Sequence, residues 1–151
     1  MSVEKQVEIL NNQKNLTKAV PSSEIYIELL KAKLLIDNDR IEEGSKLINE
    51  IEEKLKEFRS YPNIIFARLN EVKLIYFWKK EDYSLFNSVI FKYLAYADTE
   101  RLHVKEKIEL ARKTILSLLL CDSTLNFTGI TTNEFFECLN GTPHSHLLEL
   151  V

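Results

Sequence analysis

The amino-acid sequence predicts an all-α protein in which antiparallel helical hairpins stack as an α-solenoid. Apolar residues recur three and four positions apart over most of the 151 residues, which is the spacing of one helix face. Only three Gly and three Pro occur, fewer turn residues than a β-sandwich or barrel needs. Helix-start signals near residues 23, 39, 62, 82 and 100 favour successive antiparallel helices in a repeat array over a closed four-helix bundle. The array is tetratricopeptide-like in layout, although the tetratricopeptide consensus is not matched because its small-residue positions are largely absent.

The chain divides into a weak N-terminal segment and one larger unit. Residues 1–20 are predicted to form a weak helix or tail, because their amphipathic pattern is confined to Val3, Val7 and Leu10. Residues 21–151 are expected to form a single helical-repeat domain. Its first helix starts at residues 21–23, where a Ser cap precedes Glu24. Its inner stripe consists of Ile25, Leu29, Ala32 and Ile36.

The second helix has the most regular pattern in the sequence. Asp39 and Glu42 predict a capping box at its start. The apolar stripe contains Ile41, Gly44, Ile48, Ile51, Leu55 and Phe58. The opposite face, which includes Lys54, carries alternating Glu and Lys. This charge indicates a solvated face with Glu–Lys pairs, and an acidic docking face is the alternative.

Three further helices follow at similar spacing. Pro62 is expected to be the first residue of the third helix, and residues 79–82 form the turn to the fourth. Asp98 and Thr99 predict the cap of the fifth. The inner stripes of the three helices are Ile65, Leu69, Val72 and Tyr76, then Tyr83, Phe86, Ile90, Tyr93 and Ala97, then Val104, Ile108, Ala111, Ile115 and Leu118.

Composition and charge exclude several classes of function. The net charge of −3 gives no long-range attraction to phosphate backbones, so we expect no nucleic-acid partner. No run approaches the roughly 20 apolar residues of a membrane span, and the charged start around Glu4 and Lys5 does not resemble a signal peptide. Two distant Cys fit a reducing compartment. We therefore expect the cytoplasm and nucleus.

No motif for catalysis or cofactor binding emerges, and we expect no enzyme and no cofactor. There is no Gly-rich phosphate loop, and Cys121 and Cys138 are best interpreted as small core residues. The alternative is a zinc site made of both cysteines with His144 and His146, although this spacing departs from the usual ligand patterns. An enzymatic role for Cys121 or His144 is a more distant alternative. Aromatic residues around Trp78 have core spacing and lack the interleaved Arg of a base-stacking surface.

The sequence ends on an apolar segment. A cap and first-turn signal at residues 140–143 precedes a two-turn stretch with four apolar residues, Leu147, Leu148, Leu150 and Val151. Such a short helix is marginal alone in water. We therefore expect these side chains to pack on a partner or back onto the array.

Residues 111–150 resemble a known family. Leu119, Leu120, Cys121 and Asp122, then Asn126 and Phe127, then Glu137, Cys138 and Leu139 are similar to three motifs of the PCI-domain lid subunits of the proteasome regulatory particle. These are the non-ATPase regulatory subunit thirteen of animals and subunit nine of yeast. Asp82 and Tyr83 with residues 92–96 extend the likeness upstream, to about 125 residues in all.

The resemblance implies a non-catalytic scaffold of the 26S proteasome lid, in a hetero-oligomeric complex that serves ubiquitin-dependent protein degradation. It also implies that the domain ends before a winged-helix half that the family carries. Candidate interface residues are Trp78, Asn126, Phe127, Leu147, Leu148, Leu150 and Val151. The alternatives are a free-standing adaptor that binds a peptide or helix beside Trp78, and a PCI subunit of the signalosome or of a translation initiation factor.

Overall fold

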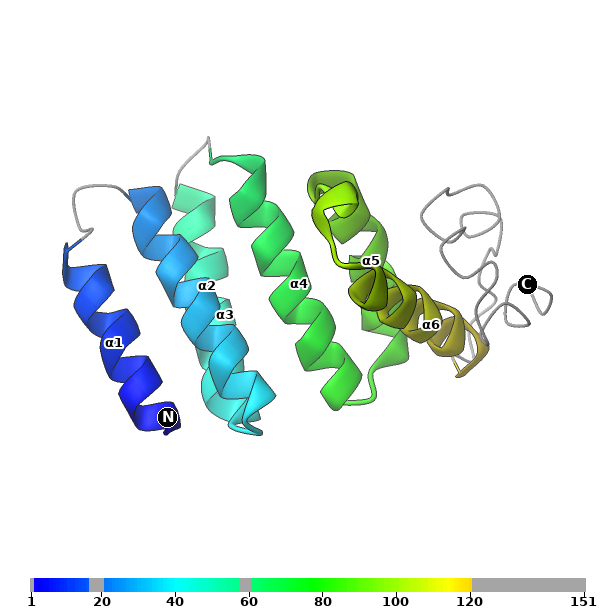
Figure 1. Ribbon diagram of the computed structural model, residues 1–151, viewed down its shortest axis with the longest axis horizontal. Coiled ribbons are helices and arrows are strands. Elements are labelled where there is room, and N and C mark those ends of the chain that lie inside the picture. Colours follow the sequence, from blue (N-terminus) through cyan, green and yellow to red (C-terminus); the bar gives the residue numbers. More distant parts are fainter. Residues whose placement is uncertain (1, 17–20, 58–60, 121–151) are drawn as a thin grey trace.

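The described part of the chain folds into six α-helices in sequential order. The computed structural model describes residues 2–16, 21–57 and 61–120. The helices are α1 (Val3–Leu16), α2 (Pro21–Asp37), α3 (Ile41–Glu57), α4 (Asn63–Lys79), α5 (Tyr83–Tyr96) and α6 (Val104–Leu120), with a short 3₁₀ helix η1 (Thr99–Arg101) before α6. Figure 1 shows them stacked side by side from the N-terminus onward. No strand occurs in these described ranges, and the predicted all-α class is confirmed.

The array has a period of 42 residues. Helices α2 and α4 begin 42 residues apart, at Pro21 and Asn63, and α3 and α5 also begin 42 residues apart, at Ile41 and Tyr83. Helix α6, at Val104, starts close to the next position of the first series. This period lies in the range of two-helix solenoid repeats. The structure is therefore a run of helix pairs, as the hairpin pattern predicted.

The α2–α3 and α4–α5 turns, which are both fully described, end their first helix in the same way. Asp39 N–H donates to Ile36 O and Arg40 N–H to Leu35 O, at 3.1 and 2.9 Å. One period later, Glu81 N–H donates to Trp78 O and Asp82 N–H to Phe77 O. Asp39 (φ 63°) and Glu81 (φ 57°) occupy the left-handed region. This pattern is the Schellman motif.

This motif corrects the capping box predicted for Asp39 and Glu42. Asp39 belongs to the end of α2, and its carboxylate accepts from Lys79 Nζ at 2.7 Å. Glu42 accepts from Lys80 Nζ at 2.8 Å. The two acids therefore link the α2–α3 turn to the α4–α5 turn of the next repeat. The predicted cap was wrong because the left-handed residue that α2 needs at its end occupies the same position.

The starts of α4 and α6 also differ from prediction. Pro62 is the residue before α4, whose first residue is Asn63. The fifth predicted helix begins at Val104 and not near residue 100, because residues 99–101 form η1. His103 caps α6: its Nδ1 accepts from Lys105 N–H, and Glu106 Oε2 accepts from His103 N–H. This arrangement is a capping box with His in the place of Ser or Thr.

Among the described residues, two apolar clusters form a core and meet at α4. The first joins α2, α3 and α4 through buried residues that include most of the predicted stripes: Ile25, Leu29, Ala32, Ile36, Ile48, Ile51, Ile65, Leu69 and Val72. The second joins α4 and α5 through Leu74, Phe86, Val89, Ile90 and Tyr93. Helix α6 buries Ala111, Ile115 and Leu118, whereas Val104 of its predicted stripe is 63% exposed.

Helix α1 packs on α2 without any buried residue of its own. Its main tether is Lys14, whose ammonium donates to the Glu28 carboxylate of α2. Lys54 of α3, which the sequence placed on the outer face, reaches the same carboxylate at 2.8 and 2.9 Å. Glu28 is only 4% exposed, so one buried carboxylate holds three helices together. The predicted division at residue 20 falls in 17–20, outside the described residues, and stays a prediction.

Candidate protein-interaction groove

An apolar groove lies between α4 and α6. Its volume is about 350 Å³. Leu74 and Ile75 of α4, Tyr93 of α5, and Leu102 and Leu110 from the α6 side form the apolar lining. Glu71, Lys105, Glu106, Glu109 and Lys113 form the charged rim. The α4–α6 groove is thus apolar inside and charged at its edges.

The groove exists because α6 does not pack beside α4 as α4 packs beside α2. Helices α2 and α4 contact each other directly, whereas α6 packs mainly on α5. The connection from α5 to α6 covers residues 97–103 and includes η1, so it is longer than the turns inside the hairpins. In Figure 1, α6 crosses the array at a steep tilt, while α2 and α4 lie nearly parallel.

A second hollow of about 330 Å³ continues the groove toward the start of α4. Its lining shares Glu71, Tyr93 and Leu102 with the first hollow and adds Ile64 and Arg68 of α4. The Ile64 side chain is 54% exposed. The shared residues make the two hollows one trough that follows α4 for several turns.

Glu71 on the α4 edge of the groove is already neutralised. Its carboxylate accepts from Lys33 Nζ of α2 at 3.1 Å and from the Arg68 guanidinium. Arg68 also lies over the Tyr26 ring, 5.6 Å from the centroid, a cation–π geometry. Tyr93 forms the floor: burial, followed by the negative charge of Glu71, raises the pKa of its hydroxyl to about 12. The floor therefore stays uncharged at neutral pH.

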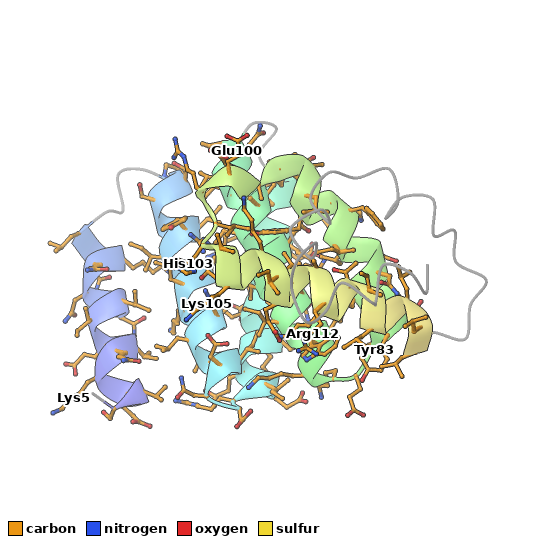
Figure 2. All side chains as sticks on the ribbon, turned by 45° about the vertical axis from the view of Figure 1, so that its right-hand side comes forward. Lys5, Tyr83, Glu100, His103, Lys105 and Arg112 are labelled. Carbon is orange, nitrogen blue, oxygen red and sulfur yellow. The ribbon has the colours of Figure 1, made fainter. Side chains whose placement is uncertain are left out.

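On the α6 edge, one described cation has no side-chain partner. Glu109 pairs with Arg112, and Lys113 lies over the Trp78 ring at 5.3 Å. Glu106 accepts a hydrogen bond from the neutral His103 N–H and so keeps its negative charge. Among the described rim residues, Lys105 is the cation whose side chain has no hydrogen bond, ion pair or ring contact, and it is exposed. Figure 2 shows His103 and Lys105 together at the first turn of α6, with Arg112 farther along the helix.

Trp78 does not line this groove. It is partly buried and packs on the second core cluster, with its ring 5.4 Å from Phe86 and 5.6 Å from Tyr83 between centroids. Lys113 covers its face. The other predicted interface residues, Asn126, Phe127, Leu147, Leu148, Leu150 and Val151, lie outside the described residues. Their role stays a prediction.

The zinc alternative also falls outside the described residues, since Cys121, Cys138, His144 and His146 all belong to 121–151. Within the described part of the chain, no three or more His, Cys, Asp or Glu side chains are placed to hold a metal ion. The described helices include none that is both long and apolar enough to cross a membrane.

Sequence reasoning missed the α4–α6 groove. Leu74, Leu102 and Leu110 have the pattern of ordinary core residues, so the sequence gives no reason to single them out. The signal that was available is the segment 97–103, where Asp98 and Thr99 resemble a cap but are followed by three residues before His103. An over-long connection at this point displaces the next helix.

Comparison with known proteins places the chain in a family. The model of PSD13 N-terminal repeats matches residues 1–151. The 26S proteasome non-ATPase regulatory subunit 13 homolog A of Arabidopsis thaliana is 27% identical over 118 residues, which cover 78% of this chain and 31% of that protein. The chain thus spans about a third of the relative's length. The resemblance drawn from residues 111–150 is confirmed: this chain belongs to the PSD13 family and corresponds to its N-terminal repeats.

Proposed function

We propose that this chain is a non-catalytic scaffold unit of the 26S proteasome regulatory-particle lid, and that it binds other lid subunits through its helix faces. The match to PSD13 N-terminal repeats over residues 1–151 carries this proposal. The name of the Arabidopsis relative, a non-ATPase regulatory subunit of the 26S proteasome, supports it. On this proposal, the protein serves ubiquitin-dependent degradation in the cytoplasm and nucleus.

The arrangement of charge supports a scaffold. Glu28 and Glu71 accept from lysines of other helices, at 2.8 Å for Lys54–Glu28 and 3.1 Å for Lys33–Glu71, and Glu42 accepts from Lys80 in the α4–α5 turn. These ionisable groups are used to fix one helix against the next. Trp78 is covered by Phe86, Tyr83 and Lys113, which favours a structural role for it over the Trp78-lined groove of a free-standing adaptor.

Co-expression with the other lid subunits of the same organism tests the proposal. We expect the chain to co-purify in a stoichiometric complex seen by native mass spectrometry. Replacement of Leu147, Leu148 and Leu150 by Asp should remove at least one subunit from that complex. Leu16→Asp is the matched control, because Leu16 is 86% exposed in α1. The proposal is contradicted if the wild-type chain does not co-purify with lid subunits, or if it does and the Asp variant retains all of them.

A further inference from the structure

We propose that the α4–α6 groove binds a helix from a partner protein. This helix fills the groove with an aliphatic stripe and pairs an Asp or Glu with Lys105. This inference deepens the proposed scaffold function and rests on it, since it specifies one surface and the chemistry of what binds there.

The apolar lining sets the first requirement on the partner. Leu74, Leu102 and Leu110 surround a floor formed by Tyr93, which is only 6% exposed. Polar groups that enter such a lining lose their water without gaining hydrogen-bond partners. Aliphatic side chains instead gain about 25 cal/mol for each Å² of apolar area removed from water. The segment that enters the groove must therefore present aliphatic side chains.

The contact between α2 and α4 in the same array indicates the shape of the segment that fills the groove. On its other side, α4 is covered by α2, whose Ile25, Leu29, Ala32 and Ile36 lie three and four residues apart and are all buried against Ile65, Leu69 and Val72. A helix with an aliphatic stripe at this spacing is thus what this array already uses to fill the space beside α4. The trough follows α4 over the stretch from Ile64 to Ile75, which is long enough to accept several turns of such a helix.

The rim sets the charge. Glu71 is neutralised by Lys33 and Arg68, and Glu109 pairs with Arg112. Glu106 keeps its negative charge, because the His103 N–H that it accepts from is neutral. The described rim and its ion-pair partners still carry a net positive charge, with Lys33, Arg68, Lys105, Arg112 and Lys113 against Glu71, Glu106 and Glu109. Lys105 is the cation in this set whose side chain has no partner. A carboxylate on the partner helix would meet a free ammonium there, whereas a lysine would meet a like charge. The groove therefore discriminates against a basic helix mainly by repulsion.

A displayed library of random 12-residue peptides, selected on the immobilised full chain, tests this assignment. We expect the selected peptides to carry aliphatic residues three and four apart and at least one Asp or Glu. By fluorescence polarisation, Leu110→Asp should weaken a selected peptide by at least about ten-fold. Lys105→Glu should weaken it about three- to ten-fold. Lys92→Glu makes the same charge change on an exposed part of α5 outside the groove and should leave binding unchanged.

A charge exchange provides the decisive comparison. A selected peptide with its acidic residue replaced by Lys should bind the wild-type chain poorly and regain affinity for the Lys105→Glu variant. Selected peptides that are predominantly basic, or that bind the Lys105→Glu and Leu110→Asp variants as tightly as the wild type, overturn the assignment. Because Lys105 is exposed, its variant tests the assignment even if Leu110→Asp fails to fold. If the wild-type chain does not co-assemble with lid subunits, the proposed scaffold function is contradicted instead. Failure of the groove assignment and failure of the scaffold function are therefore distinguishable.

Discussion

The buried carboxylate of Glu28 should contribute measurably to stability, and Glu28→Gln tests this. The side chain is 5% exposed and accepts from Lys14 and Lys54, whose side chains are 30% and 42% exposed. Breaking a fully buried ion pair costs about 3–5 kcal/mol, whereas an exposed pair contributes about 0.2–1 kcal/mol. Because both lysines remain partly hydrated and there are two of them, we expect Glu28→Gln to lower the free energy of unfolding by about 1.5–3 kcal/mol.

The effect should depend on pH in a defined direction. Burial by itself would raise the pKa of Glu28, but hydrogen bonds from Lys14 and Lys54 outweigh it and hold the pKa below the ordinary value of 4.5. A carboxylate with a lowered folded-state pKa stabilises the protein above its unfolded-state pKa, and this stabilisation is lost as the pH falls through the folded-state value. The difference between wild type and Glu28→Gln should therefore be complete at pH 6–7 and shrink below about pH 4.5.

Urea denaturation followed by circular dichroism at a series of pH values from 7 to 3 measures the loss in the free energy of unfolding and its dependence on pH. Glu53→Gln is the matched control, since the Glu53 side chain is 71% exposed and pairs with Lys56 on its own helix. We expect it to change the free energy of unfolding by less than about 0.5 kcal/mol. The reasoning is refuted if the two variants lose the same stability, or if the effect of Glu28→Gln is independent of pH.

Three further outcomes follow from single contacts. Glu81→Gly should stabilise the fold by about 0.5–1 kcal/mol in thermal denaturation, because Glu81 has φ 57° and Gly adopts this region without strain; a loss of stability would contradict this. Ser117→Ala should destabilise by about 1–3 kcal/mol, since Ser117 donates to buried Asn87 at 2.6 Å and the amide oxygen would be left unpaired. The double variant Asn87→Leu with Ser117→Ala should recover much of this in urea denaturation, and an additive loss would argue against the explanation. Absorbance titration should show one of the six tyrosines ionising at about pH 12, and this transition should be absent in Tyr93→Phe. Because the raised pKa favours the protonated folded state, the stability contributed by Tyr93 should be lost between about pH 10 and 12.

Much of the fold could be predicted from the sequence because helix periodicity reports burial directly. The stripe of α3 predicted Ile48 and Ile51 as core, and both are buried. Helix boundaries were less predictable, since caps depend on three-dimensional partners: Asp39 resembles an N-cap, but the left-handed end of α2 requires that position. His103 was missed because His is not among the usual capping residues, although its Nδ1 can accept like a hydroxyl oxygen.

The buried polar groups and the groove could not be predicted, for a different reason. Glu28, Asn87 and Ser117 have ordinary neighbours in sequence, and their burial follows from helices far along the chain, such as Lys54 reaching Glu28 over 26 positions. The α4–α6 groove depends on the tilt of α6, which is set by the path of residues 97–103. Local patterns specify which face of a helix is buried, but not how far the next helix stands from it.

The 42-residue period has a consequence for how the protein forms during translation. Each helix pairs mainly with elements next to it in the array, as α2 does with α1, α3 and α4, so few contacts join distant parts of the chain. Chains with such short-range contacts fold quickly, and N-terminal units can assemble while later ones are still being synthesised. Helices α1 to α3 can therefore associate on the ribosome before α6 has emerged from the exit tunnel.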